Sequence, residues 1–115
     1  MDKRHHHRFI ARLDVRILPG DSVPSDLVLS TLDIAVGGAL CAANLDLPAD
    51  TRMHMTFTLV GGDLRDPVTI DVEARVLRCR ENPDSIPARR YEMALEFVKI
   101  DPEDRRRLQS YLNSL

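Results

Sequence analysis

The sequence predicts an all-β fold, a small six-stranded antiparallel β-barrel followed by one C-terminal α-helix. Three observations lead to this prediction. Short segments of alternating apolar and polar residues follow one another along most of the chain, and clusters of Gly, Pro, Asn and Asp separate them. Only the end of the chain has the periodicity of an amphipathic helix. Short strands at close spacing are typical of a small barrel, and an OB-like or SH3-like barrel is the alternative.

The first half of the chain contains three predicted strands. Apolar residues alternate with charged ones in the first of them, as in a half-buried strand, and a turn-forming run that begins at Pro19 ends it. A glycine pair, Gly37 and Gly38, separates the second strand from a third that consists of small residues. The three segments are Phe9 to Ile17, Leu27 to Leu32 with an extension to Asp33, and Ala39 to Ala43.

The second half contains three more predicted strands. A hairpin-like turn, Gly61-Gly62-Asp63, follows the first of these. In the next strand the apolar residues share one face up to Val76, after which Leu77 and Cys79 take the apolar positions. This change of parity predicts a β-bulge near Val76, which bends a strand around a small barrel. The segments are Met53 to Leu59, Val68 to Cys79, and Tyr91 to Phe97, the last with Tyr91, Met93, Leu95 and Phe97 inward.

The chain closes with a predicted helix over residues 101–115. Asp101 stands at the N-cap and Pro102 at the first helical position, while the acidic residues Glu103 and Asp104 suit the positive end of the helix dipole. An apolar stripe at helical spacing is expected to pack on the barrel or on a partner. It consists of Leu108, Tyr111, Leu112 and Leu115.

Length and composition predict one globular domain over residues 1–115, with an arm at 1–8, the barrel at 9–98 and the helix at 101–115. The chain is 43% hydrophobic and 30% charged, a balance without bias towards disorder. It contains neither a run of about 20 apolar residues nor a secretory signal, so we expect a cytoplasmic protein without membrane insertion. Cys41 and Cys79 lack partners at metal or redox spacing and are expected to be reduced, packed thiols.

Positive charge is concentrated at the N-terminus. The net charge of −2 argues against binding of nucleic-acid polymers, yet Lys3, Arg4, Arg8 and Arg12 lie within the first dozen residues. This segment can offer a cationic site to a small anion. Arginines further along, in particular Arg75, Arg78 and Arg80, are interpreted as solvated faces, with the alternative that Arg78 or Arg80 reaches a neighbouring site from the strand end.

Two short motifs occur in a fixed order around the predicted strands. Arg4-His5-His6-His7-Arg8 has the form R-x-x-x-R, and Asp33-Ile34-Ala35-Val36-Gly37-Gly38 has the form D-x-A-x-x-G. The chain resembles the PilZ family over essentially its whole length. The resemblance lies in the order and separation of the two motifs and in the ending, Ile100 to Arg105 before a Leu-rich helix. The resemblance implies a β-barrel that is not an enzyme and binds the bacterial second messenger cyclic di-GMP, with no cofactor.

The resemblance also implies roles for individual residues. Arg4 and Arg8 would pair bidentately with phosphate or guanine, and Asp33 would accept from the guanine donor edge. Gly38 would allow close approach of the ligand. Ala35 stands where the family has Ser, so one hydroxyl is missing and a lower affinity is expected. Lys3 and His7 are further candidates.

Alternative interpretations accompany this one. The arginines can be a solvated terminus, Asp33 to Gly38 can be a connecting turn, and the three adjacent histidines can suggest a metal site, although four ligands at suitable spacing are not present. The expected function is a receptor or adaptor in which the nucleotide orders the arginine arm, changes the surface and regulates an unidentified protein partner. A degenerate interaction module that binds no nucleotide is the alternative. The chain is expected to be a monomer or dimer.

Overall fold

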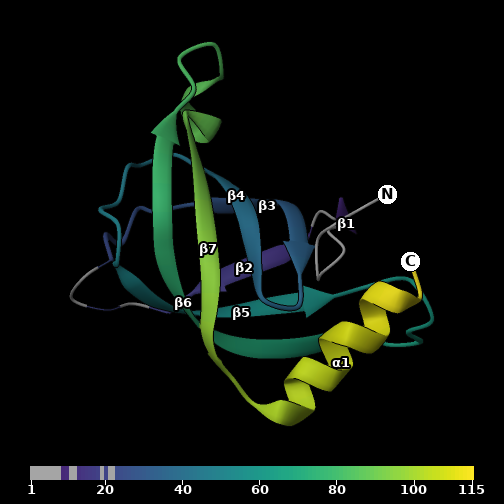
Figure 1. Ribbon diagram of the computed structural model, residues 1–115. Helices are drawn as coiled ribbons and strands as arrows, with labels where there is room; N and C mark the ends of the chain where they lie inside the picture. The colour runs from purple at the N-terminus through teal and green to yellow at the C-terminus, as the bar shows by residue number, and fades with distance from the viewer. Residues whose placement is uncertain (1–8, 11–12, 19, 21–22) are drawn as a thin grey trace, which may run out of the picture.

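The computed structural model describes residues 9–10, 13–18, 20 and 23–115, and its strands form one antiparallel sheet that curls around the core (Figure 1). The strand order is β1-β3-β4-β7-β6-β5-β2. The strands are β1 (Phe9–Ile10), β2 (Asp14–Ile17), β3 (Leu29–Ala35), β4 (Gly38–Ala43), β5 (Arg52–Leu59), β6 (Val68–Glu81) and β7 (Tyr91–Ile100). A short 3-10 helix (Pro87–Arg89) lies in the β6–β7 loop, and helix α1 (Pro102–Asn113) follows the sheet.

The first predicted strand is two strands at opposite edges of the sheet. β1 pairs with β3, whereas β2 pairs with β5, so the prediction of one continuous strand from Phe9 to Ile17 is wrong. When the chain crosses from one edge of the sheet to the other, its hydrogen bonds pass from β3 to β5. A regular series of backbone hydrogen bonds to one strand cannot continue through that crossing. Counted as one interrupted strand, these pieces give six antiparallel strands in a curled half-barrel, which confirms the predicted fold class.

A buried hydroxyl joins the two edges near this interruption. The backbone N–H of Leu13 donates to Thr31 Oγ1 at 2.7 Å, and the Thr31 hydroxyl donates to the Leu13 carbonyl at 3.2 Å. Thr31 is only 1% exposed, so its side chain satisfies both backbone groups of Leu13 where no ladder does. The bulge in β3 between Thr31 and Asp33 lies directly beside this contact.

Alternate residues of the long strands fill the core. The inward faces predicted for β5 and for the middle of β7 are confirmed, and the rings of Phe57 and Phe97 meet edge to face at 5.7 Å. Burial, with a smaller contribution from the Asp33 carboxylate, raises the pKa of Cys41 to about 12, so this thiol stays protonated. The largest fully buried side chains are Phe57, Ile34, Met55, Leu59, Ile70, Met93, Leu108, Leu112, Val76, Thr31 and Cys41.

The predicted bulge in β6 is present, and it corrects one side chain. The register of β6 against β7 shifts between Val76 and Arg78. Leu77 is the extra residue and is 46% exposed, so its predicted apolar position in the core is wrong. Beyond the bulge Cys79 packs against the core and Arg78 lies on the outer face.

Helix α1 begins and packs as the sequence predicts, except at its end. The Asp101 side chain accepts from the backbone N–H of Glu103 at 2.9 Å, and Leu108, Tyr111 and Leu112 are buried. Leu115 lies beyond the end of the helix and is 53% exposed, so its predicted place in the stripe is wrong. No helix in residues 9–10, 13–18, 20 and 23–115 is long and apolar enough to cross a membrane.

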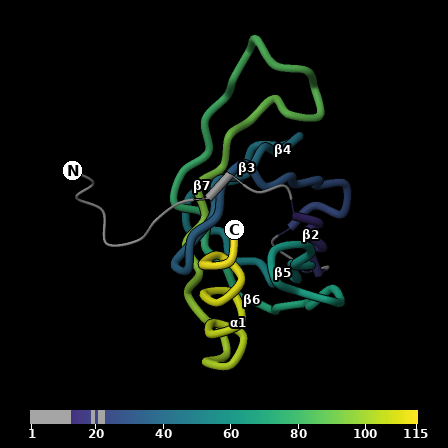
Figure 2. Tube along the Cα trace, turned by 90° about the vertical axis from the view of Figure 1, so that its right-hand side faces the viewer, coloured from purple at the N-terminus to yellow at the C-terminus, as the bar shows by residue number. Residues whose placement is uncertain are grey.

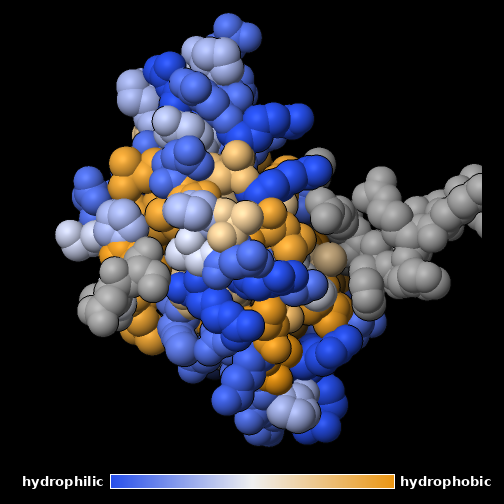
Figure 3. All heavy atoms as spheres, turned by 60° about the vertical axis from the view of Figure 1, so that its left-hand side comes forward, coloured by the Kyte–Doolittle hydropathy of each residue, from blue (hydrophilic) through white to orange (hydrophobic). Residues whose placement is uncertain are grey.

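The β6–β7 hairpin projects past the rest of the sheet at the end away from α1, in both Figure 1 and Figure 2. On the face drawn in Figure 3, this upper end is mainly hydrophilic, while hydrophobic side chains gather over the body of the molecule. Strand β6 carries Arg75, Arg78 and Arg80.

Candidate functional site

The segment Asp33 to Gly38 forms the hairpin between β3 and β4. Ala35 pairs with Gly38 across a two-residue turn, and the carbonyl of Gly37 accepts from the backbone N–H of Phe97 at 2.9 Å. Ile34 points into the core, so its neighbours in the strand, Asp33 and Ala35, share the outer face. The hairpin therefore holds Asp33 and Ala35 side by side outside the barrel.

Gly38 has a structural reason to be glycine. β4 approaches β7 so closely here that a Cβ at position 38 would collide with the backbone carbonyl of Leu95. A carbonyl that belongs to the sheet cannot rotate away as a side chain can. Gly38 is thus required by strand packing even before any ligand is considered, and the adjacent Gly37 has no atom within 4 Å of the corresponding position.

Strand register extends the outer face from the β3–β4 hairpin to β6. Residues directly opposite one another in neighbouring strands form rows across the sheet, and alternate rows face outward. The row through Asp33 contains, on successive strands, Leu40 of β4, Ala94 of β7 and Arg78 of β6. The rows on either side are Ala35, Gly38, Glu96 and Arg75, and then Ala42, Glu92 and Arg80.

Small residues form the middle of this outer face. Ala35 and Ala42 are 7% and 4% exposed although neither belongs to the core cluster, and Gly38 and Ala94 lie beside them. We call Ala35, Gly38, Leu40, Ala42 and Ala94 the small-residue floor; four of the five are Gly or Ala, and Leu40 is the one larger side chain. Asp33 stands at its β3 side and the three arginines at its β6 side.

The arginines differ in their partners. Arg75 donates to Glu96 at 2.9 Å and to Asp50 at 2.8 Å, and the hydrogen bond with Glu96 is the main cause that raises its pKa. Arg80 donates to Glu92 at 3.3 Å. Arg78 faces Ala94 instead of a carboxylate, and within the part of the chain that the structure describes it has no ion pair.

The model of the PilZ domain family matches residues 2–114. The chain belongs to the PilZ family. This is a family of cyclic di-GMP receptors, whose domains bind ligands or act as adaptors rather than enzymes. No curated protein matched the sequence.

One solved structure extends the comparison of fold. It is the structure of Bacillus subtilis Inhibitor of motility (MotI/DgrA), similar with a TM-score of 0.75 at 23% sequence identity. The match covers 98% of this PilZ chain but 51% of that protein. The chain thus spans about half the length of the protein it matches, and at this identity the likeness establishes the fold.

The sequence-predicted residues of this PilZ domain fall into two groups. Asp33, Ala35 and Gly38 lie together at one side of the small-residue floor. Arg4, Arg8, Lys3 and His7 lie outside the described residues, as do the adjacent histidines considered for a metal. Among the residues that are described, no three His, Cys, Asp or Glu side chains form a metal-binding group.

The sequence favoured a solvated Arg78, with reach to a neighbouring site as an alternative that it shared with Arg80. The parity change that predicts the bulge also places Arg78 on the outer face, so its orientation was predictable from the sequence. Its alignment with Asp33 was not predictable, because it depends on the pairing of β4 with β7, which are far apart in the chain.

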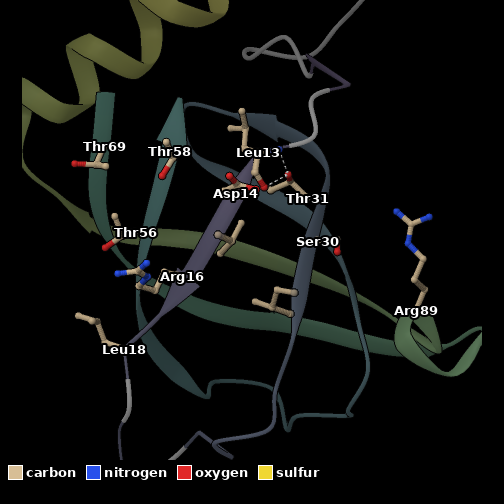
Figure 4. Close-up of a pocket in the computed structure, with 12 residues that line it drawn as sticks. Leu13, Asp14, Arg16, Leu18, Ser30, Thr31, Thr56, Thr58, Thr69 and Arg89 are labelled. Atoms are coloured by element: carbon tan, nitrogen blue, oxygen red, sulfur yellow. Dashed lines mark hydrogen bonds between the residues drawn. The ribbon is translucent and has the colours of Figure 1, made fainter. Parts of the chain in front are cut away.

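One cavity of this PilZ domain is separate from the motif. It has a volume of about 780 Å³, lies along β2 and β3, and contains none of Asp33, Ala35 and Gly38 (Figure 4). Its wall is rich in hydroxyls, and the two Leu13 to Thr31 hydrogen bonds lie within it. The motif residues lie on the outer face of the sheet instead. The lining residues are Leu13, Asp14, Val15, Arg16, Leu18, Leu29, Ser30, Thr31, Thr56, Thr58, Thr69 and Arg89.

Proposed function

We propose that this chain is a cyclic di-GMP receptor and adaptor that binds the nucleotide over the small-residue floor. Membership of the PilZ family supports cyclic di-GMP as the ligand. The observation that carries the proposal is the position of Asp33 and Ala35, which stand together on the outer face beside a floor in which four of the five residues are Gly or Ala. A planar base lies closely against such a floor, because of its five residues only Leu40 has a side chain that rises far above the backbone.

The chemistry of the ligand matches the residue types of the two motifs. The Asp33 carboxylate accepts from guanine N1–H and N2–H₂, a donor pair that adenine lacks. The guanidinium groups of Arg4 and Arg8 pair bidentately with the phosphates or stack on a base. In this proposal Gly38 holds the hairpin in place against Leu95, and Ala35 leaves room for the base next to Asp33.

The proposed output is a changed surface that a protein partner recognises. Once Arg4 and Arg8 are engaged by the ligand, the segment that carries them covers part of the outer face. Inhibition of motility, named for the similar Bacillus protein, is one example of an output that suits such a protein. The degenerate, nucleotide-free module is the alternative outcome of the experiment below.

Calorimetric titration tests the proposed function. We expect cyclic di-GMP to bind, and to bind more tightly than cyclic di-AMP, because Asp33 selects the guanine donor edge. Arg4→Ala and Arg8→Ala should each weaken binding about tenfold or more, since each removes a charge-assisted contact of about 1.5–3 kcal/mol. Arg65→Ala, an exposed arginine of the β5–β6 loop, is the matched control. Absence of binding at high-micromolar nucleotide would favour the degenerate module.

Restoring the missing hydroxyl should strengthen binding. Ala35→Ser adds one neutral hydrogen bond beside Asp33, so we expect affinity for cyclic di-GMP to rise by about 0.5–1.5 kcal/mol. The melting temperature of the free protein should hardly change, because Ala35 lies outside the core cluster. Ala49→Ser in an exposed loop is the control. Unchanged or weaker binding by Ala35→Ser would show that position 35 does not meet the ligand.

A further inference from the structure

The outer face has an unneutralised cation opposite Asp33. Of the three arginines that β6 places there, Arg75 and Arg80 are each paired with the glutamate of their own row on β7. In the row of Arg78 that position is Ala94, and no carboxylate of the described residues pairs with Arg78. The guanidinium of Arg78 is therefore available to a ligand, whereas its two neighbours are engaged.

Asp33 and Arg78 lie at the two ends of one row. The strands β3, β4, β7 and β6 are consecutive in the sheet, and Leu40 and Ala94 are the intervening members of the row. Three strand spacings separate the Cα atoms of Asp33 and Arg78 by about 14 Å. The Asp33 carboxylate and a bent Arg78 side chain can extend towards each other across the outer face. The space left between them accommodates a purine with a hydrogen bond of about 2.9 Å at each edge.

The two edges of guanine need opposite kinds of partner. Its N1–H and N2–H₂ donors suit a carboxylate, and its N7 and O6 acceptors suit an arginine fork. We propose that Arg78 is a second guanine-reading residue, which contacts N7 and O6 while Asp33 holds the donor edge and the base lies on the small-residue floor between them. This inference rests on the proposed function, since it assigns a further residue to the same site.

The first experiment compares two arginines in titrations with cyclic di-GMP. Arg78→Ala should weaken binding about tenfold or more, because a charge-assisted contact is lost. Arg106 of α1 is exposed and has no ion pair among the residues that the structure describes, so Arg106→Ala should change affinity less than twofold. Ala94→Glu should also weaken binding, because it gives Arg78 the row partner that its neighbours already have.

The second experiment identifies the ligand atom. A cyclic dinucleotide that contains 7-deazaguanine lacks the N7 acceptor. The wild-type chain should bind it more weakly than cyclic di-GMP, whereas Arg78→Ala should bind the two ligands equally. Equal losses of affinity in both proteins, or an Arg78→Ala variant that binds cyclic di-GMP like Arg106→Ala, overturn the role of Arg78 while the proposed function stands. A wild-type chain that binds no cyclic di-GMP overturns both.

Discussion

Gly38→Ala is expected to lower the melting temperature by on the order of 10 °C, which corresponds to a destabilisation of about 2–4 kcal/mol. The added Cβ would collide with the carbonyl of Leu95, and β4 can avoid it only by moving away from β7. That movement would strain the pairs that join Gly38 to Glu96 and Ala39 to Leu95. Thermal unfolding followed by circular dichroism measures the change.

The neighbouring glycine provides the control for Gly38. A Cβ at Gly37 meets no atom within 4 Å, and Gly37 is not among the glycines with positive φ. Gly37→Ala should therefore leave stability unchanged or raise it by about 0.4–1 kcal/mol, because alanine restricts the unfolded chain. Equal melting temperatures for the Gly37 and Gly38 variants would mean that β4 does not lie against Leu95 as described.

Asp33→Ala is expected to weaken cyclic di-GMP binding about hundredfold or more. The carboxylate is proposed to accept two hydrogen bonds from guanine, each charge-assisted and worth about 1.5–3 kcal/mol. Selectivity over cyclic di-AMP should fall with affinity, because adenine lacks this donor pair. Calorimetric titration of wild type and variant with both nucleotides gives the affinity for cyclic di-GMP and the selectivity over cyclic di-AMP.

Two controls separate a binding role of Asp33 from a structural one. Asp33 takes part in an interaction within the protein, so the melting temperature of unliganded Asp33→Ala must be measured alongside affinity. Asp84→Ala removes an exposed carboxylate from the β6–β7 loop and should leave binding unchanged. If Asp33→Ala binds cyclic di-GMP within twofold of wild type, Asp33 is not a ligand contact.

Local pattern predicted most of the strands but not their partners. Alternation marks the inward faces of β5 and β7, and the parity change near Val76 marks the bulge, because both are properties of one strand and its own two faces. Alternation does not say which strand lies alongside. The division of residues 9–17 between β3 and β5 therefore had no signal in the sequence.

The candidate site divides in the same way. The motif identified Asp33, Ala35 and Gly38 and placed them around a turn, since they lie within six residues of one another. It did not explain why position 38 must be glycine, because the colliding carbonyl belongs to Leu95 on another strand. Nor did it single out Arg78, whose distinction from Arg75 and Arg80 depends on the residues opposite them on β7.

The division of the first strand between the two sheet edges also sets an order of assembly. During synthesis β1 and β2 leave the ribosome before β3 and β5, the strands with which they pair. Contacts between distant segments form late, because long loops must close first. A segment synthesised before its partners is thus among the last to be fixed, and until then the open edges of β3 and β5 resemble the unpaired strands through which nascent chains associate.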